Sequence, residues 1–193
     1  MLNLDDYVLS AEAYTVRLML ALLDIPYVRQ AVDAYPGTAP APVLRDGDLE
    51  LRDVGLILTH LVRGHAKEQA WTAGAHAAEV AKWLTFAAVD LRPLSSARRV
   101  AVLGLQGDLG ALNMKGRRAL RALEDHLTRR RIAGADWVAG EGPTVADVAI
   151  FPHVALSHDS GIGHEDYPAI HLWQRRVRLL PRFITMPGIP DYH

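Results

Sequence analysis

Cysteine is absent from all 193 residues of the sequence. The protein therefore forms no disulfide, has no thiolate nucleophile of its own and offers no cysteine ligand to zinc or to an iron–sulfur cluster. Any sulfur chemistry that it performs must use the thiol of a substrate.

The sequence also lacks an excess of charge of either sign. It has 21 Lys and Arg and 22 Asp and Glu, which gives a formal net charge of -1. Without a basic stripe, the sequence makes no electrostatic case for nucleic acid or an anionic membrane as a partner. No apolar run approaches the roughly 20 residues that a membrane span needs. The N-terminal segment MLNLDDYVLS carries acids where a secretory signal has a basic region, so we expect a cytoplasmic protein.

The residue pattern changes near residue 64. Up to that point it predicts short strands and two helices, in the order strand 2–9, helix 11–25, strand 27–33, hairpin 42–52 and helix 54–63. Beyond it the pattern predicts only helices, at 77–91, 98–106, 112–130, 144–157 and 169–180. We therefore expect a small α/β unit over residues 1–64 and an all-helical unit over residues 71–193, joined by a linker.

The segment GPTVADVAIF contains a recognisable helix start. Thr144 is followed three residues later by Asp147, which is the spacing of a capping box. In such a box the hydroxyl accepts from the third helical N–H, while the acid accepts from the N–H of the cap residue. This structural role is favoured over a catalytic role for Asp147.

Several segments resemble the cytosolic glutathione S-transferase family over almost the full length. SAEAYTVRLMLALLDIPY, PVLRDGDLELRD and ILTHL are similar to its N-terminal domain, and WLTFAAVDL, WVAGEGPTVADVAIFPHV and YPAIHLWQRRVRLLPRF to its C-terminal domain. The resemblance implies an α/β thioredoxin-like N-terminal domain plus an all-α C-terminal helical domain. It also implies glutathione as a substrate, a small-molecule electrophile as its acceptor, and a homodimer.

The thiol of glutathione is mostly protonated at neutral pH, so the family's enzymes favour its thiolate with a hydroxyl donor near a helix N-terminus. By resemblance Ser10 matches such a thiol-activating serine, and the alternative is that Ser10 only caps the helix. Tyr7 is a second hydroxyl within reach, although packing is the stronger interpretation of a strand tyrosine. Ala13 stands where cysteine-type relatives keep a reactive cysteine, which excludes a cysteine-type mechanism.

The resemblance assigns the docking of glutathione to two further places. Ala41 and Pro42 match a cis peptide bond whose main-chain groups hold the cysteinyl part of the ligand, and such a bond is tolerated essentially only before proline. Asp53 matches the acid that meets the ligand's ammonium group, but Val54 stands where the family carries Ser or Thr. Because the Val54 N–H remains, we expect the ligand's carboxylate to be bound more weakly by about 0.5–1.5 kcal/mol.

The segment AYPGTAPA, residues 34–41, is too short and too rich in proline and glycine for the family's second helix. We therefore predict that one wall of the usual glutathione pocket is missing, or is rebuilt by Arg45, Arg52 or a partner subunit.

By resemblance Trp83, Phe86 and Asp90 line the acceptor site and the dimer seam, whereas core packing is the default for the two aromatic side chains. The nine histidines show no i, i+4 pair and no ligand pattern with a carboxylate, so we predict no metal site.

Three functions stay open at this point. The first is a transferase that directs a glutathione-type thiol at an electrophilic small molecule. The second is a non-catalytic binding or scaffold protein with a degenerate glutathione site. The third is a lyase or isomerase that uses the thiol on one pathway intermediate.

Overall fold

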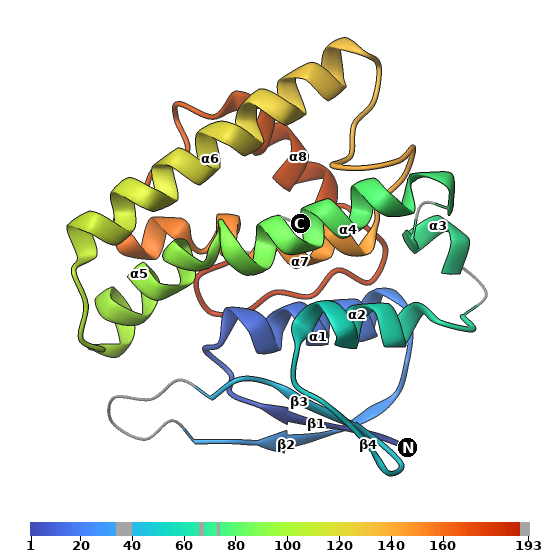
Figure 1. Ribbon diagram of the computed structural model, residues 1–193. Helices are drawn as coiled ribbons and strands as arrows, with labels where there is room; N and C mark the ends of the chain where they lie inside the picture. Colours follow the sequence, from blue (N-terminus) through green and yellow to red (C-terminus); the bar gives the residue numbers. More distant parts are fainter. Residues whose placement is uncertain (34–39, 66–67, 73, 190–193) are drawn as a thin grey trace.

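The computed structural model describes residues 1–33, 40–65, 68–72 and 74–189. Its N-terminal part contains four strands, β1 (Leu2–Asp6), β2 (Tyr27–Ala31), β3 (Val43–Asp46) and β4 (Leu49–Leu51). They form one sheet in the order β2-β1-β3-β4, in which β1 is parallel to β2 and antiparallel to β3, and β3 is antiparallel to β4. Helices α1 (Ala11–Leu22) and α2 (Val54–Val62) cover the same face of this sheet (Figure 1).

Local sequence explains how these elements begin and end. The hairpin between β3 and β4 turns at Gly47, whose φ of 59° suits glycine. The chain leaves α1 through Asp24, which also has a positive φ of 59°, a conformation that short polar side chains tolerate. Leu4 on β1 pairs with Leu44 on β3, and both side chains are buried against the helices. The sheet therefore contributes one apolar face to the core.

Only helices follow the sheet in the described part of the chain, apart from one isolated bridge between Met186 and Ile189. They are α3 (Glu68–Thr72), α4 (Ala77–Val89), α5 (Arg92–Leu103), α6 (Leu109–Ile132), α7 (Val145–Ala155), α8 (Pro168–Arg178) and the short 3-10 helices η1 (Gly74–His76) and η2 (Ser157–Ser160). None of the described helices is long and apolar enough to cross a membrane.

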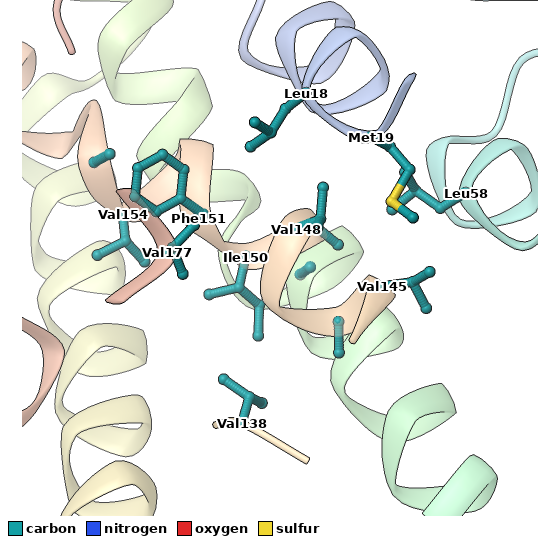
Figure 2. Packing of buried hydrophobic residues seen from close by; sticks show 14 of the residues in the cluster. Leu18, Met19, Leu58, Val138, Val145, Val148, Ile150, Phe151, Val154 and Val177 are labelled. Atoms are coloured by element: carbon teal, nitrogen blue, oxygen red, sulfur yellow. The ribbon is translucent and has the colours of Figure 1, made fainter. Parts of the chain in front are cut away.

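Helix α7 is the centre of the core, and all of its residues are buried. It packs against α1 and α2 on the side of the sheet, and against α4, α5 and α8 in the helical part. In Figure 2, Leu18 of α1 and Leu58 of α2 lie on the side of α7 where Val145 and Val148 project. One apolar cluster thus continues through both parts of the molecule.

The predicted fold class, a thioredoxin-like sheet with helices followed by an all-helical part, is confirmed. Several boundaries differ from the sequence analysis, and β1 ends at Asp6 instead of residue 9. Helix α5 begins at Arg92 instead of residue 98, because Pro93 lies in its first turn, where proline is tolerated. The expected linker contains the start of α3. The prediction that residues 34–41 form no helix falls mainly on residues 34–39, outside the described part.

The capping box at the start of α7 forms, and its acid has further partners. The Thr144 N–H and the Thr144 hydroxyl each donate to Asp147 Oδ2 at 2.9 Å. Asp147 Oδ1 accepts from the Val138 N–H at 3.0 Å and from Trp173 Nε1 at 2.8 Å. Thr144 and Asp147 are both fully buried, so each of these donors relies on the carboxylate instead of water.

We expect Thr144→Ala to lower the free energy of unfolding by about 1–2 kcal/mol without changing ligand affinity. Asp147→Ala should lower the free energy of unfolding by more, about 3 kcal/mol or above relative to the parent, since buried donors on three residues lose their acceptor. Urea unfolding of both variants measures the difference. Equal destabilisation by the two substitutions would show that Asp147 serves only as a cap.

Candidate functional site

A cavity of about 420 Å³ lies between the N-terminal part and the helical part. One side is formed by the first turn of α1, the residues just before β3 and the start of α2. The other side is formed by α4, α5 and α7. This volume is within the range of about 300–1,000 Å³ that is typical of small-molecule sites. Larger cavities exist elsewhere, but polar groups from both parts of the molecule converge on this one.

The N-terminus of α2 opens onto the cavity. Asp53 caps this helix, and its Oδ1 accepts from the Leu56 N–H at 2.9 Å. Asp53, Val54 and Gly55 all line the cavity. The N–H groups of the first helical turn have no intrahelical acceptor, and the helix dipole favours negative charge there. The start of α2 can therefore hold a carboxylate beside the carboxylate of Asp53, which can hold an amine.

Ala41 and Pro42 line the cavity, but their peptide bond is trans. No described residue is preceded by a cis bond, so the prediction of a cis bond before Pro42 is wrong. The trans form is favoured by about 0.5–1 kcal/mol before proline. Residues 40–42 run into β3 without a turn, which leaves no local bend that requires the cis form.

Ser10 is the N-cap of α1, and its Oγ accepts from the Ala13 N–H at 3.1 Å. The Ser10 hydroxyl donates to Glu12 Oε2 at 3.1 Å. Ser10 is buried and does not line the cavity, whereas Glu12 does. The helix-cap interpretation of Ser10 describes this geometry, and thiol activation by Ser10 stays a prediction.

Sequence reasoning missed four charged or titratable residues of the cavity, Glu12, Arg92, Arg99 and His153. Arg99 Nη2 lies 2.6 Å from Glu12 Oε1, so an ion pair joins α5 to α1. His153 of α7 is buried, and its Nδ1 lies 2.6 Å from Ser95 Oγ. Burial lowers the pKa of His153, Glu12 raises it and Arg99 lowers it, with a net lowering that favours neutral imidazole at neutral pH. No local spacing reveals this group, because its members come from three different helices.

Trp83, Phe86 and Asp90 do not line this cavity. The Trp83 ring is buried and packs against Phe86 and His126, with ring centroids 4.9 and 4.2 Å apart. Helix α4 turns Leu84, Ala87 and Ala88 toward the cavity instead. With about 3.6 residues per turn, the mean direction of these residues is roughly 120° away from that of Trp83 and Phe86.

Other candidates lie at the edge of the site or outside it. Arg52 lines the cavity and is paired with Glu50 at 2.7 Å, whereas Arg45 is paired with Asp5 and Glu50 and does not line it. Tyr7 is half-buried and also lies outside the lining. Within the described ranges, no group of three or more His, Asp or Glu side chains could hold a metal ion.

The Glu12–Arg99 pair should make stability depend on pH. Burial raises the pKa of Glu12. Arg99, His153 and hydrogen bonds together lower it by more than burial raises it, so the net pKa lies below the ordinary 4.5. A lowered folded pKa contributes stability above the unfolded pKa, and this contribution is lost as the pH falls through the folded value. We therefore expect Glu12→Gln to reduce the loss of stability as the pH falls below about 5.

Urea midpoints at several pH values measure this effect, with Glu141→Gln as the control at an exposed glutamate. The same pH profile in Glu12→Gln and in the parent would contradict an energetic role for the pair.

Comparison with known proteins adds three findings. Residues 108–176 match the family model described as "Glutathione S-transferase, C-terminal domain". A possible glutathione S-transferase from Rhodopseudomonas palustris is 27% identical, with a TM-score of 0.83 over 100% of this chain and 93% of the other. A glutathione S-transferase from Pseudomonas fluorescens is 26% identical, with a TM-score of 0.80 over 96% and 98% of the two chains.

A curated relative matches over a shorter stretch. The disulfide-bond oxidoreductase YfcG of Escherichia coli is 32% identical over 56 residues, which are 29% of this chain and 26% of YfcG. The match thus spans about a quarter of that relative's length. The matched helical domain and the structural similarity over the full length show the glutathione S-transferase fold and support membership of that family.

Proposed function

We propose that the protein binds glutathione, or a closely related thiol, in the cavity between its two parts and directs the thiol at an electrophilic small molecule. The observation that carries this proposal is the convergence of Asp53 and the N-terminus of α2 with polar side chains of α5 and α7 on one cavity. Family membership supports it, as do the relatives from R. palustris and P. fluorescens that are named as glutathione S-transferases.

The γ-glutamyl end of the ligand fits the start of α2. Its ammonium group pairs with the Asp53 oxygen that does not cap the helix. Its carboxylate accepts from the N–H groups of Val54 and Gly55, and Arg52 beside them adds positive charge. Val54 contributes no hydroxyl, so this end is held by main-chain groups and electrostatics.

The acceptor molecule faces the helical part. Leu84, Ala87 and Ala88 of α4 supply apolar surface there. Arg92 also lines the cavity, and the described residues give its side chain no ion pair. An electrophile with an apolar body and an anionic group suits this side of the cavity.

Thiol activation depends on the Ser10 hydroxyl and on the charges around it. Ser10 reaches a thiolate only after its hydroxyl gives up the bond to Glu12. Arg99 neutralises Glu12, so the pair adds little net field at the sulfur. We expect weak thiol activation and modest turnover.

The same observation favours a second function, a non-catalytic binding protein. In that case Ser10 is solely the cap of α1, and the Glu12–Arg99 pair joins the two parts of the molecule. Glutathione binding separates a thiol-using protein from a bare scaffold, and turnover separates a catalyst from a binder.

The proposal includes a cytoplasmic homodimer. Cytoplasmic thiols are kept reduced, as a thiol substrate requires. Leu56 on α2 and Val89 on α4 are 60% and 62% exposed, and these two helices are in contact. Exposed apolar side chains on neighbouring helices are suitable contacts for a second copy.

Val54→Ser should strengthen glutathione binding by about 0.5–1.5 kcal/mol, the net contribution of one restored hydrogen bond. Calorimetry with glutathione measures the change. Val54→Ala is the matched control, because it shortens the side chain without adding a hydroxyl. If neither the parent nor Val54→Ser bound glutathione, the proposal would be wrong and the scaffold function would be favoured.

Ser10→Ala should reduce turnover of an aryl halide with glutathione more than it weakens glutathione binding, because a hydroxyl near sulfur matters most when the charge is on sulfur. Ser10→Thr keeps both the cap and the hydroxyl and should retain activity. Loss of the cap also lowers stability by about 1 kcal/mol, so rates are compared well below the unfolding transition. Full activity in Ser10→Ala would restrict Ser10 to its role as a helix cap.

A further inference from the structure

A second cavity, of about 530 Å³, lies beside η2 and α8, and no described residue lines both cavities. Its polar lining consists of His158, His164, His171, Gln174, Arg175 and Arg178. No described residue that lines it is acidic. Neither the thiol chemistry nor the core packing explains why this many basic groups gather in one place.

Helix α8 supplies most of this lining from one face. His171, Gln174, Arg175 and Arg178 follow each other at i, i+3, i+4 and i+7, the spacing of a single helical stripe. In an ordinary packed helix such a stripe is apolar, but here it carries two guanidinium groups and an imidazole. Arg175 is exposed, and the described residues give its side chain no ion pair.

His164 faces this stripe in a fixed orientation. The Ser157 hydroxyl donates its only hydrogen to the Val154 carbonyl at 2.9 Å. In the 2.7 Å hydrogen bond between His164 Nε2 and Ser157 Oγ, the histidine is therefore the donor and the hydroxyl oxygen the acceptor. This bond holds the ring in place, and Gln174 supplies a second side-chain hydrogen bond to His164.

Gln174 supplies a donor without a partner. Its side chain is 3% exposed, and its Nε2 has no hydrogen-bond partner among the described residues. A buried donor left unpaired costs about 1–3 kcal/mol. Because Gln174 lines the cavity, the oxygen of a bound anion would offer this amide an acceptor.

We propose that this second cavity binds a small polyvalent anion, a phosphorylated or polycarboxylate molecule whose charges meet Arg175, Arg178 and the histidines. The volume exceeds that of a single phosphate and leaves room for an organic body against Ala155 and Leu179. A metal ion does not suit the site, because two guanidinium groups repel it and the described residues contain no metal-binding cluster.

Anion binding should take up protons. Burial lowers the pKa of His164, and His158 and Arg178 lower it further, while Gln174 and Glu165 raise it, for a net position below 6.5. The other nearby acid, Asp159, already accepts from Arg98 at 2.7 Å and lies 3.3 Å from His158. A bound anion adds negative charge and favours the imidazolium form, so affinity should rise as the pH falls.

Calorimetry on the full chain with pyrophosphate and with citrate at neutral pH tests the site. Tighter binding of pyrophosphate assigns phosphorylated molecules, and tighter binding of citrate assigns polycarboxylates. Arg175→Gln and His171→Asn should each weaken binding by at least about fivefold, or roughly 1 kcal/mol. Arg131→Gln, at an exposed arginine of α6 that does not line the cavity, removes the same charge and should leave binding unchanged.

The pH dependence is measured with meta-benzenedisulfonate, whose charge stays constant from about pH 6 to pH 8 while histidines titrate. Binding should be tighter at the lower pH, and Arg175→Gln should weaken it at both. No binding of either pyrophosphate or citrate overturns the proposal. Equal weakening by Arg131→Gln also overturns it, since attraction would then follow net charge and not this cavity. Glutathione takes no part in these measurements, so their outcome is independent of the thiol site.

Discussion

The rest of the structure depends on the hydrogen bonds that the buried carboxylate of Asp147 accepts. It collects hydrogen bonds from the loop at Val138, from the cap residue Thr144 and from Trp173 of α8. These bonds fix where α7 starts, and α7 is the helix on which both parts of the molecule pack. Because α7 also carries His153 into the cavity, the geometry of the candidate site follows from the placement of one buried acid.

The charges in that site explain why family membership alone does not establish activity. Glu12 lies two residues after Ser10 and accepts a hydrogen bond from the Ser10 hydroxyl. Arg99 of the helical part forms an ion pair with Glu12 and holds it in place. The same three groups can hold the two parts of the molecule together or take part in thiol chemistry. Which role prevails depends on whether a thiolate competes better than the Glu12 carboxylate for one hydroxyl hydrogen.

Structural features that depend on neighbouring residues in the sequence were predictable. Features that depend on packing between distant elements were not. Hydrophobic periodicity predicted the order of strands and helices, and the Thr144–Asp147 spacing predicted the capping box. Pro42 and Asp53, which the resemblance assigned to glutathione docking, both line the cavity. The resemblance gave the wrong isomer for the bond before Pro42, which depends on a small energy difference. The Glu12, Arg99 and His153 group comes from three helices, so no sequence window contains it.

The two cavities differ in chemistry although one continuous stretch of chain contributes to both. The first combines carboxylates, guanidinium groups and a helix N-terminus, as a zwitterionic ligand requires, whereas the second is lined by basic groups and by no acid among the described residues. Helix α7 gives His153 to the first cavity, and its last residue, Ala155, to the second. A shared helix places two sites in a fixed geometry, but it couples them only if it has two arrangements that the ligands distinguish. Because α7 is buried along its whole length and anchored at Asp147, the structure favours two independent sites.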